Sequence, residues 1–218
     1  MATDDAIDIT WYGQAMFTVS GGGVAVAIDP VPPDVGYPYD PVDADLLLIS
    51  HGHFDHNYVD GVKGNPRLIS GSGAFAIDGL EVTGYDSFHD ESRGAARGPV
   101  VIYAWEQAGF KLAHFGDLGD RPAADVMKSL EGLDVAMIPV GGIFTIDGEQ
   151  AARLVRDLAP TIVLPMHFGT PDCAIDLEPV ESFTRRFKGT VREIAERPVT
   201  VTRETLPSST EVWVLPYK

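Results

Sequence analysis

Cysteine and long apolar runs are scarce in this sequence, and each scarcity excludes a class of protein. The single cysteine, Cys173, excludes a disulfide within the chain. No apolar run approaches the ~20 residues that a membrane-spanning helix requires. The start, Met1 to Asp5, lacks the basic and apolar segments of a secretory signal. We therefore expect a cytoplasmic protein without a membrane partner.

Positive charge is scarce as well. The chain has 16 lysine and arginine residues against 32 aspartate and glutamate residues, which gives a formal net charge of -16. Nucleic acids and anionic membranes are polyanions and would be repelled by such a protein, so we expect neither as the main partner.

The composition is that of a folded globular protein. Hydrophobic residues make up 44% and charged residues 22%, and no proline-, serine- or glutamine-rich tract marks a linker. A chain of 218 residues can bury a substantial core. We expect residues 1–218 to form one domain, which is compatible with a homo-oligomer.

The periodicity of apolar residues predicts short strands and a few helices. The expected strands lie at residues 7–19, 24–28, 45–49, 67–70, 80–85, 100–106, 110–115, 133–140 and 161–165, and the expected helices at 122–130, 148–158 and 178–187. Strands at the start and strand–helix alternation late in the chain predict a layered α/β fold. The proline-rich segment Val31 to Asp43 reads as a loop, which could form a wall of a substrate pocket or cover the surface.

One stretch is dense in metal-ligand side chains. Residues 50–56 contain three histidines and one aspartate, directly after the apolar strand predicted at 45–49. Neutral imidazole binds zinc, iron or manganese well, and carboxylate suits the harder of these ions. The alternative, a surface loop with incidental histidines, does not explain four ligand-type side chains in six positions.

The spacing within this stretch suggests two ions. Side chains two residues apart in extended backbone point to the same side, so His51 and His53 can bind one ion together. Asp55 and His56 follow after the chain has begun to turn, and can face a second ion.

Further ligand-type residues lie at or just after other predicted strand ends, where a sheet can hold converging side chains rigidly. His89 alone is a weak signal. Asp117 follows the small residue Gly116, which allows a close approach to two ions, and His167 follows a buried strand, where an unpaired imidazole would be costly. His114 could orient a ligand or be a hydrogen-bonded core histidine.

Taken together, these segments resemble the metallo-β-lactamase superfamily. The resemblance rests on His-x-His-x-Asp-His at 51–56, the isolated His89, Gly-Asp at 116–117 and His167. More narrowly, the segments 9–15, 114–119, 138–142 and 165–168 look like small single-domain metal-dependent hydrolases that include relatives of ascorbate-6-phosphate lactonase. The resemblance implies an αββα sandwich of two roughly similar halves, with metals at the sheet edge. Many relatives carry histidine where Gln14 stands, and the inserted domain of RNA-processing members is absent.

The resemblance also implies the ligand set and the chemistry. One divalent ion would be bound by His51, His53 and His89 and the other by Asp55, His56 and His167, while Asp117 bridges the pair; the catalytic residues would be Asp55 and Asp117. Zinc is the first choice of ion, with manganese or iron as alternatives. A hydroxide shared by two metals would attack an electrophilic carbonyl or phosphorus.

The sequence does not identify the substrate, which we expect to be a small anionic molecule. A lactone or other ester, a phosphodiester and an amide are all compatible, and the resemblance favours a sugar-phosphate lactone. Arg93 and Arg97 could bind a carboxylate or phosphate, or be solvated surface arginines. A di-iron redox protein and a non-catalytic binding module are the alternatives to a hydrolase.

Overall fold

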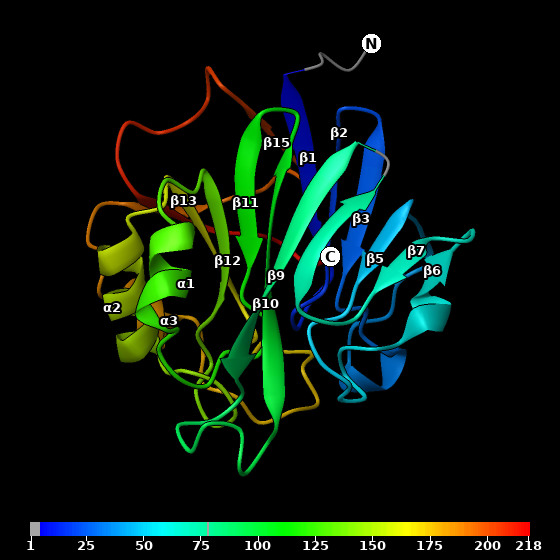
Figure 1. Cartoon of the computed structure of the whole chain (residues 1–218). Coiled ribbons are helices and arrows are strands. Elements are labelled where there is room, and N and C mark those ends of the chain that lie inside the picture. The colour runs from blue at the N-terminus through cyan, green and yellow to red at the C-terminus, as the bar shows by residue number, and fades with distance from the viewer. Residues whose placement is uncertain (1–4, 78) are drawn as a thin grey trace.

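The computed structural model describes residues 5–77 and 79–218, and consists of two β-sheets that enclose a shared apolar core (Figure 1). The first sheet has the strand order β15 (Val199–Thr202), β1 (Ala6–Trp11), β2 (Phe17–Gly21), β3 (Val24–Ile28), β5 (Leu46–Leu48) and β7 (Arg67–Ile69). The second has the order β14 (Val191–Glu193), β16 (Glu211–Val214), β13 (Ile162–Met166), β12 (Val135–Pro139), β11 (Phe110–His114), β10 (Pro99–Gln107), β9 (Leu80–Phe88) and β8 (Gly73–Ile77).

The helices lie beside the eight-stranded sheet (Figure 1). They are α1 (Ala124–Ser129), α2 (Gly148–Leu158) and α3 (Glu181–Thr184). On the side of the six-stranded sheet the described chain forms the 3-10 turns η1 (Pro33–Val35) and η2 (Val59–Gly61) and a small pair of strands, β4 (Val42–Asp43) and β6 (Val62–Lys63). The predicted layered α/β sandwich is confirmed, but its two halves are less alike than expected.

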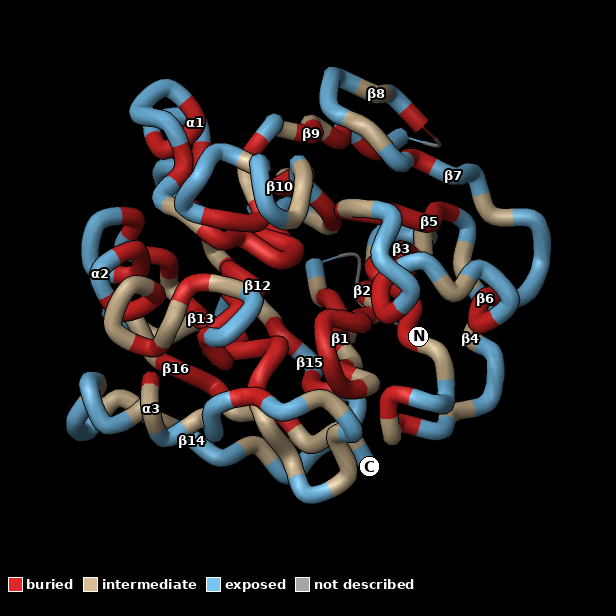
Figure 2. The backbone as a smooth tube through the Cα atoms, turned by 90° about the horizontal axis from the view of Figure 1, so that it is seen from below, coloured by how far each residue is buried: buried red, intermediate tan, exposed pale blue. Residues whose placement is uncertain are grey.

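The most apolar segments form the centre of the second sheet. All residues of β12 and β13 are buried, because parallel strands in the middle of a sheet are covered on both faces (Figure 2). Helix α2 covers one of these faces with Ala151, Leu154 and Val155. Its N-terminus is fixed by a capping box. The Asp147 carboxylate accepts from the Gln150 amide, and the Gln150 side-chain oxygen accepts from the Asp147 amide.

Several predicted elements differ from the structure. The strand predicted at 7–19 is two strands, because the chain turns at Gly13 (φ 98°) and Gln14 (φ 49°). The helix predicted at 178–187 is only the four residues of α3. Around it the chain forms tighter turn bonds, such as Ser182 amide to Pro179 carbonyl and Phe187 amide to Thr184 carbonyl, instead of continuous helical bonds. The strands β8, β14, β15 and β16 were not predicted, and the helix predicted from Pro122 begins at Ala124. Within the described residues no helix is long and apolar enough to cross a membrane.

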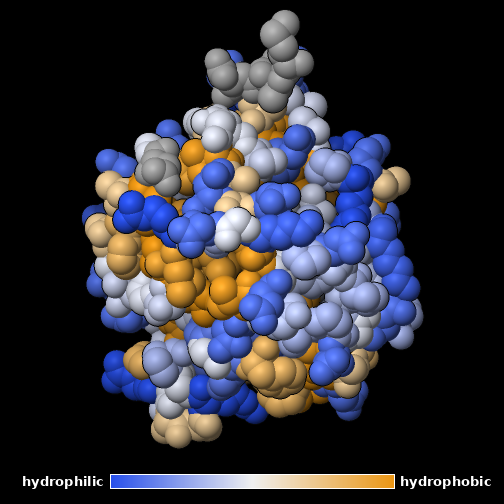
Figure 3. Space-filling view, turned by 90° about the vertical axis from the view of Figure 1, so that its right-hand side faces the viewer, coloured by the Kyte–Doolittle hydropathy of each residue, from blue (hydrophilic) through white to orange (hydrophobic). Residues whose placement is uncertain are grey.

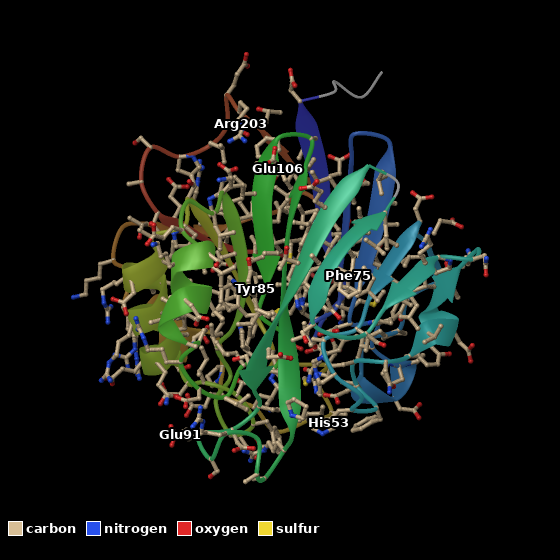
Figure 4. All side chains as sticks on the ribbon, viewed as in Figure 1. His53, Phe75, Tyr85, Glu91, Glu106 and Arg203 are labelled. Carbon is tan, nitrogen blue, oxygen red and sulfur yellow. The ribbon has the colours of Figure 1, made fainter. Side chains whose placement is uncertain are left out.

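The loops after β5, β9, β11 and β13 meet at one edge of the sandwich. His53, after β5, and Glu91, after β9, both lie at this edge, at the bottom of the view in Figure 4. The predicted ligand segments therefore converge because the strands that precede them end together.

Candidate metal centre

The carboxylate of Asp117 lies at the centre of the histidine cluster. Its Oδ1 is 3.2 Å from Nε2 of His56, and its Oδ2 is 3.2 Å from Nε2 of both His89 and His167. His51 approaches the same oxygen at 3.9 Å. Asp117 is 2% exposed, so this carboxylate is surrounded by imidazoles instead of water.

The structure brings all seven predicted ligands together, and their donor atoms form two compact groups. Within each group the atoms lie within 4.8 Å of one another; the groups are His51, His53 and His89, and Asp55, His56 and His167, and a third such group in the described chain joins His51 and His56 to Asp29. This division is the one that the resemblance implied. Asp117 lies between the groups, with one oxygen near His56 of the second group and the other near His89 of the first and His167 of the second.

Asp29, which sequence reasoning missed, orients two of these histidines. Its Oδ2 accepts hydrogen bonds from Nδ1 of His56 at 3.0 Å and from the Ser50 hydroxyl at 2.6 Å, and its Oδ1 accepts from the Ser50 amide. The Ser50 hydroxyl in turn accepts from Nδ1 of His51 at 3.0 Å. With both Nδ1 atoms protonated, the Nε2 lone pairs of His51 and His56 face the cluster.

A sequence signal for Asp29 did exist. Asp29 ends β3, which is the neighbour of β5 in the sheet, so it lies beside the segment that begins at Ser50. A carboxylate at the end of a buried strand requires a partner, and the nearest chain segment is rich in histidine. Its fully buried side chain and left-handed backbone (φ 45°) were not visible from the sequence.

Gln14 supports the second group of ligands. Its side-chain amide donates to Oδ2 of Asp55 at 3.0 Å, and its backbone carbonyl accepts from the His167 amide at 2.9 Å. The Trp11 indole donates to the same carbonyl. The turn at Gly13 and Gln14 therefore serves to orient Asp55 and His167.

His114 is a hydrogen-bonded core histidine. It is fully buried, its Nε2 donates to the Ala15 carbonyl at 2.8 Å, and its Nδ1 accepts from the Gly116 amide at 3.2 Å. It comes no closer than 3.9 Å to Asp29. Its contribution to the cluster is therefore indirect, through the backbone that leads to Asp117.

Two glycines allow the ligand segments to pack closely. A Cβ on Gly119 would lie 2.2 Å from the backbone carbon of His89, and a Cβ on Gly141 would lie 2.1 Å from the carbonyl oxygen of His167. Contacts this short exclude any side chain, so Gly119 and Gly141 allow the close packing that places two of the predicted ligands.

Without a bound ion the histidines of the cluster differ in protonation, and an ion on Nε2 of His56 would displace the proton there. Burial, reinforced by the neighbouring His56, lowers the pKa of His51 to about 3 and so keeps it neutral, which is the ligand form. Burial opposes a charge on His56 too, but Asp117, Asp29 and Asp55 outweigh it and raise the His56 pKa well above its usual range. Burial would also raise the pKa of Asp117, yet His167 and His56 hold it well below the usual range.

The unpaired atoms of the cluster fit a cation. Within the described part of the chain, Nε2 of His51, Nε2 of His56 and Oδ1 of Asp117 are buried without a hydrogen-bond partner. Leaving such atoms unpaired costs free energy. Nε2 of His51 and Oδ1 of Asp117 have free lone pairs, and Nε2 of His56 offers one when an ion displaces its proton. The observed donor set is therefore suited to divalent metal ions.

A cavity of about 410 Å³ opens onto the cluster. Its lining consists of His53, Phe54, Asp55, His89, Arg97, Asp117, Phe144, His167 and Ile175. No residue of the loop 31–43 lines this cavity, so the expectation that the loop forms a wall is wrong. Tyr37 of that loop is instead buried, with its ring against the backbone of Gly13 and its hydroxyl bonded to Thr170 at 2.8 Å.

Comparisons with known proteins agree with this geometry. Residues 8–167 match the family model of the beta-lactamase superfamily domain. A UPF0173 metal-dependent hydrolase of Methanopyrus kandleri is 30% identical over 85% of this chain and 92% of its own length, and one of Nitratidesulfovibrio vulgaris is 31% identical over 74% and 80%. A Thermotoga maritima structure, assigned to the zinc-dependent hydrolases of the metallo-beta-lactamase superfamily, covers 96% of this chain and 98% of its own, with 29% identity and a TM-score of 0.79.

Proposed function

Since the chain belongs to the UPF0173 metal-dependent hydrolases of the metallo-β-lactamase superfamily, we propose that it hydrolyses an ester, lactone or phosphoester at a centre of two divalent metal ions. The protein is a metal-dependent hydrolase by this membership. The number of ions, their ligands and the bond that is broken are the further steps of the proposal.

The position of Asp117 is the observation that carries the proposal. A carboxylate whose two oxygens approach histidines of both ligand groups can bind one ion with each oxygen. One ion would be bound by His51, His53 and His89, and the other by Asp55, His56 and His167. Zinc is the first choice because five of the six terminal ligands are imidazoles, and manganese or iron are the alternatives.

Bound divalent ions supply two kinds of chemistry at such a site: they lower the pKa of water toward ~7 and they stabilise negative charge that develops on the substrate. The protein's own residues supply the rest. Asp55 faces the cavity, and although burial opposes its charge, a hydrogen bond with His56 lowers its pKa to about 2. It is therefore ionised at neutral pH and can orient the attacking water by accepting a hydrogen bond from it.

The family and the geometry leave the substrate open within this reaction class. The resemblance favours a sugar-phosphate lactone, whose phosphate could meet Arg97 at the cavity. A cytoplasmic location, the absence of a nucleic-acid partner and self-association stay predictions of the sequence.

Metal analysis combined with a substrate panel tests the proposal. We expect protein purified without added metal, then saturated with zinc and passed over a desalting column, to retain two ions per chain. That form should hydrolyse 4-nitrophenyl acetate, a lactone or a phosphodiester, and a chelator should abolish the activity. One tightly bound ion per chain at full activity contradicts the two-ion centre, and no hydrolysis in the panel contradicts the reaction class.

A further inference from the structure

The cavity beside the metal cluster has an unusual lining. Apart from the predicted ligands, it is lined by Phe54, Phe144, Ile175 and Arg97. Phe54 is 66% exposed and Phe144 is 38% exposed, although large aromatic side chains are normally buried. Exposed apolar groups around a cavity with one convergent cation are typical of a ligand-binding surface.

We propose that the substrate is an amphiphilic anion, with an apolar chain that contacts Phe54, Phe144 and Ile175 and one acidic group that binds Arg97. This inference rests on the proposed function and narrows its substrate class. The lining offers few polar partners for sugar hydroxyls beyond the residues that would bind metal. An apolar chain therefore suits this cavity better than a sugar does.

The loop that contains Arg97 fixes the backbone of this residue beside the cavity. The carboxylate of Asp90 accepts four backbone hydrogen bonds, from Ser92, Gly94, Ala96 and Arg97, over 2.7 to 3.1 Å. These bonds fold the loop after β9 around one buried side chain, so the backbone of Arg97 is fixed close to the ligand His89.

A second loop fixes the guanidinium itself. Nη2 of Arg97 donates to the Ile143 carbonyl at 3.1 Å, and the guanidinium carbon lies 5.4 Å from the centre of the Phe144 ring. A guanidinium has five N–H groups, so this single bond leaves a pair that can bind an oxyanion in a bidentate manner. In a chain with a net charge of -16, the single cationic side chain of this lining selects where an anion binds.

Arg93 provides a matched control within the same loop. Its guanidinium carbon lies 5.7 Å from the centre of the Phe88 ring, and Arg93 is not among the residues that line the cavity. Replacing Arg93 or Arg97 by glutamine removes the same charge from the same loop. Only the second substitution removes it from the cavity.

The probes for the test are esters that share one leaving group. The free acid and the methyl ester of 4-nitrophenyl suberate differ in one negative charge, and 4-nitrophenyl adipate has two fewer methylenes. An ester that ends in a phosphonate distinguishes phosphate recognition from carboxylate recognition, and 6-phosphogluconolactone represents sugar-phosphate lactones. All assays use the full-length zinc-loaded chain, and the metal content of each variant is measured.

For the native protein we expect kcat/KM to be higher for the suberate acid than for its methyl ester. We also expect it to rise from adipate to suberate, by up to about fourfold for each methylene that is buried. Arg97→Gln should lower the acid-to-methyl-ester ratio by about tenfold or more, mainly through KM, because it removes a charge-assisted hydrogen bond. Arg93→Gln should leave this ratio unchanged.

Phe54→Ala tests the apolar part. It should reduce the preference for suberate over adipate, whereas Leu68→Ala, at a 54% exposed position on β7 outside the cavity lining, should not. The side of the molecule that carries β6 and β7 has its own hydrophobic area, so this control also tests whether any exposed apolar surface would serve (Figure 3).

The outcomes separate this inference from the proposed function. Equal kcat/KM for acid and methyl ester, or an unchanged ratio in Arg97→Gln, overturns the role of Arg97. A preference for 6-phosphogluconolactone over the suberate acid overturns the apolar chain. If no probe is hydrolysed by chain that contains zinc, the proposed function itself is wrong, whereas hydrolysis without these preferences contradicts only the inference.

Discussion

The carboxylate of Asp29 lies 3.0 Å from Nδ1 of His56, and both side chains are fully buried. Asp29 is not placed to bind an ion with that oxygen, because its Oδ2 already accepts from His56 and from Ser50. Asp29 instead orients the imidazole of His56, and through the Ser50 hydroxyl it also orients the imidazole of His51. One residue thus links a ligand of each group.

Asp29→Asn should weaken metal binding without removing any ligand. The variant loses the charge that stabilises a protonated Nδ1 on His56, and we expect metal affinity or activity to fall by ~10 to 100-fold. Competition with a zinc chelator measures the affinity. Asp60→Asn, an exposed aspartate close after the ligand stretch, is the control and should bind zinc as the native protein does. If Asp29→Asn binds zinc as tightly as the native protein does, Asp29 does not orient the histidines for metal binding.

Asp117→Asn separates a bridging ligand from its neighbour in sequence. The substitution retains the volume but loses the charge that offsets two dications, so we expect the loss of at least one ion per chain and of nearly all hydrolysis. His114→Ala should keep both ions, because His114 bonds only to backbone, yet it should lower the melting temperature by leaving the Ala15 carbonyl and the Gly116 amide unpaired. Elemental analysis and thermal melts decide between the two. An Asp117→Asn protein with two ions and near-normal rate would show the two-ion mechanism to be wrong.

The predicted metal-ligand stretch at residues 51–56 could be recognised because all the evidence for it lies within six neighbouring residues. Four ligand-type residues in six positions after an apolar strand indicate a metal site without any knowledge of the fold, and β5 and β13 are read from unbroken apolar runs. Two of the strands that were missed, β8 and β14, are edge strands with exposed residues. Their sequences lack the apolar pattern, because pairing with a neighbour, not burial, determines them.

The residues that orient ligands were not predictable in the same way. Asp29 and Gln14 act across the sheets, on residues 27 and 41 positions away, so their role depends on the strand order. For the loop 31–43, in contrast, the sequence suggested a role at the cavity that the structure does not show. Proline and tyrosine suggested a pocket wall, but Tyr37 packs on Gly13 and bonds to Thr170, which is not among the residues that line the cavity.

Tyr37→Phe should therefore affect stability and leave substrate binding unchanged. The variant loses the hydrogen bond to Thr170, typically worth ~1 kcal/mol, and keeps the packed ring. We expect a reduced free energy of unfolding in urea and a KM equal to that of the native protein. A raised KM with unchanged stability would restore the loop as part of the substrate site.

Asp90→Asn should destabilise the protein in a pH-dependent way. Although burial opposes its charge, hydrogen bonds from Arg97, Ala96, Ser92 and Gly94 lower the pKa of Asp90 in the folded chain. A lowered folded pKa means that the carboxylate stabilises the fold above the unfolded pKa of ~3.9, and that this contribution is lost as pH falls through the folded value. The difference in unfolding free energy between native protein and variant should be constant near neutral pH and shrink below about pH 4. A difference that grows on acidification contradicts this account.

The Gln14 side chain has one hydrogen-bond partner in the site, the carboxylate of Asp55. Gln14→Leu keeps the backbone carbonyl that binds the His167 amide but removes the donor to Asp55, so Asp55 loses the contact that aims its carboxylate. We expect kcat to fall by ~10 to 100-fold, with a melting temperature close to that of the native protein, since the buried Oε1 of Gln14 has no partner to lose within the described residues. Gln14→His offers a ring N–H in place of the amide and should recover most of the rate. If Gln14→Leu and Gln14→His lose the same activity, orientation of Asp55 is not the function of this position, and the turn at Gly13 serves His167 alone.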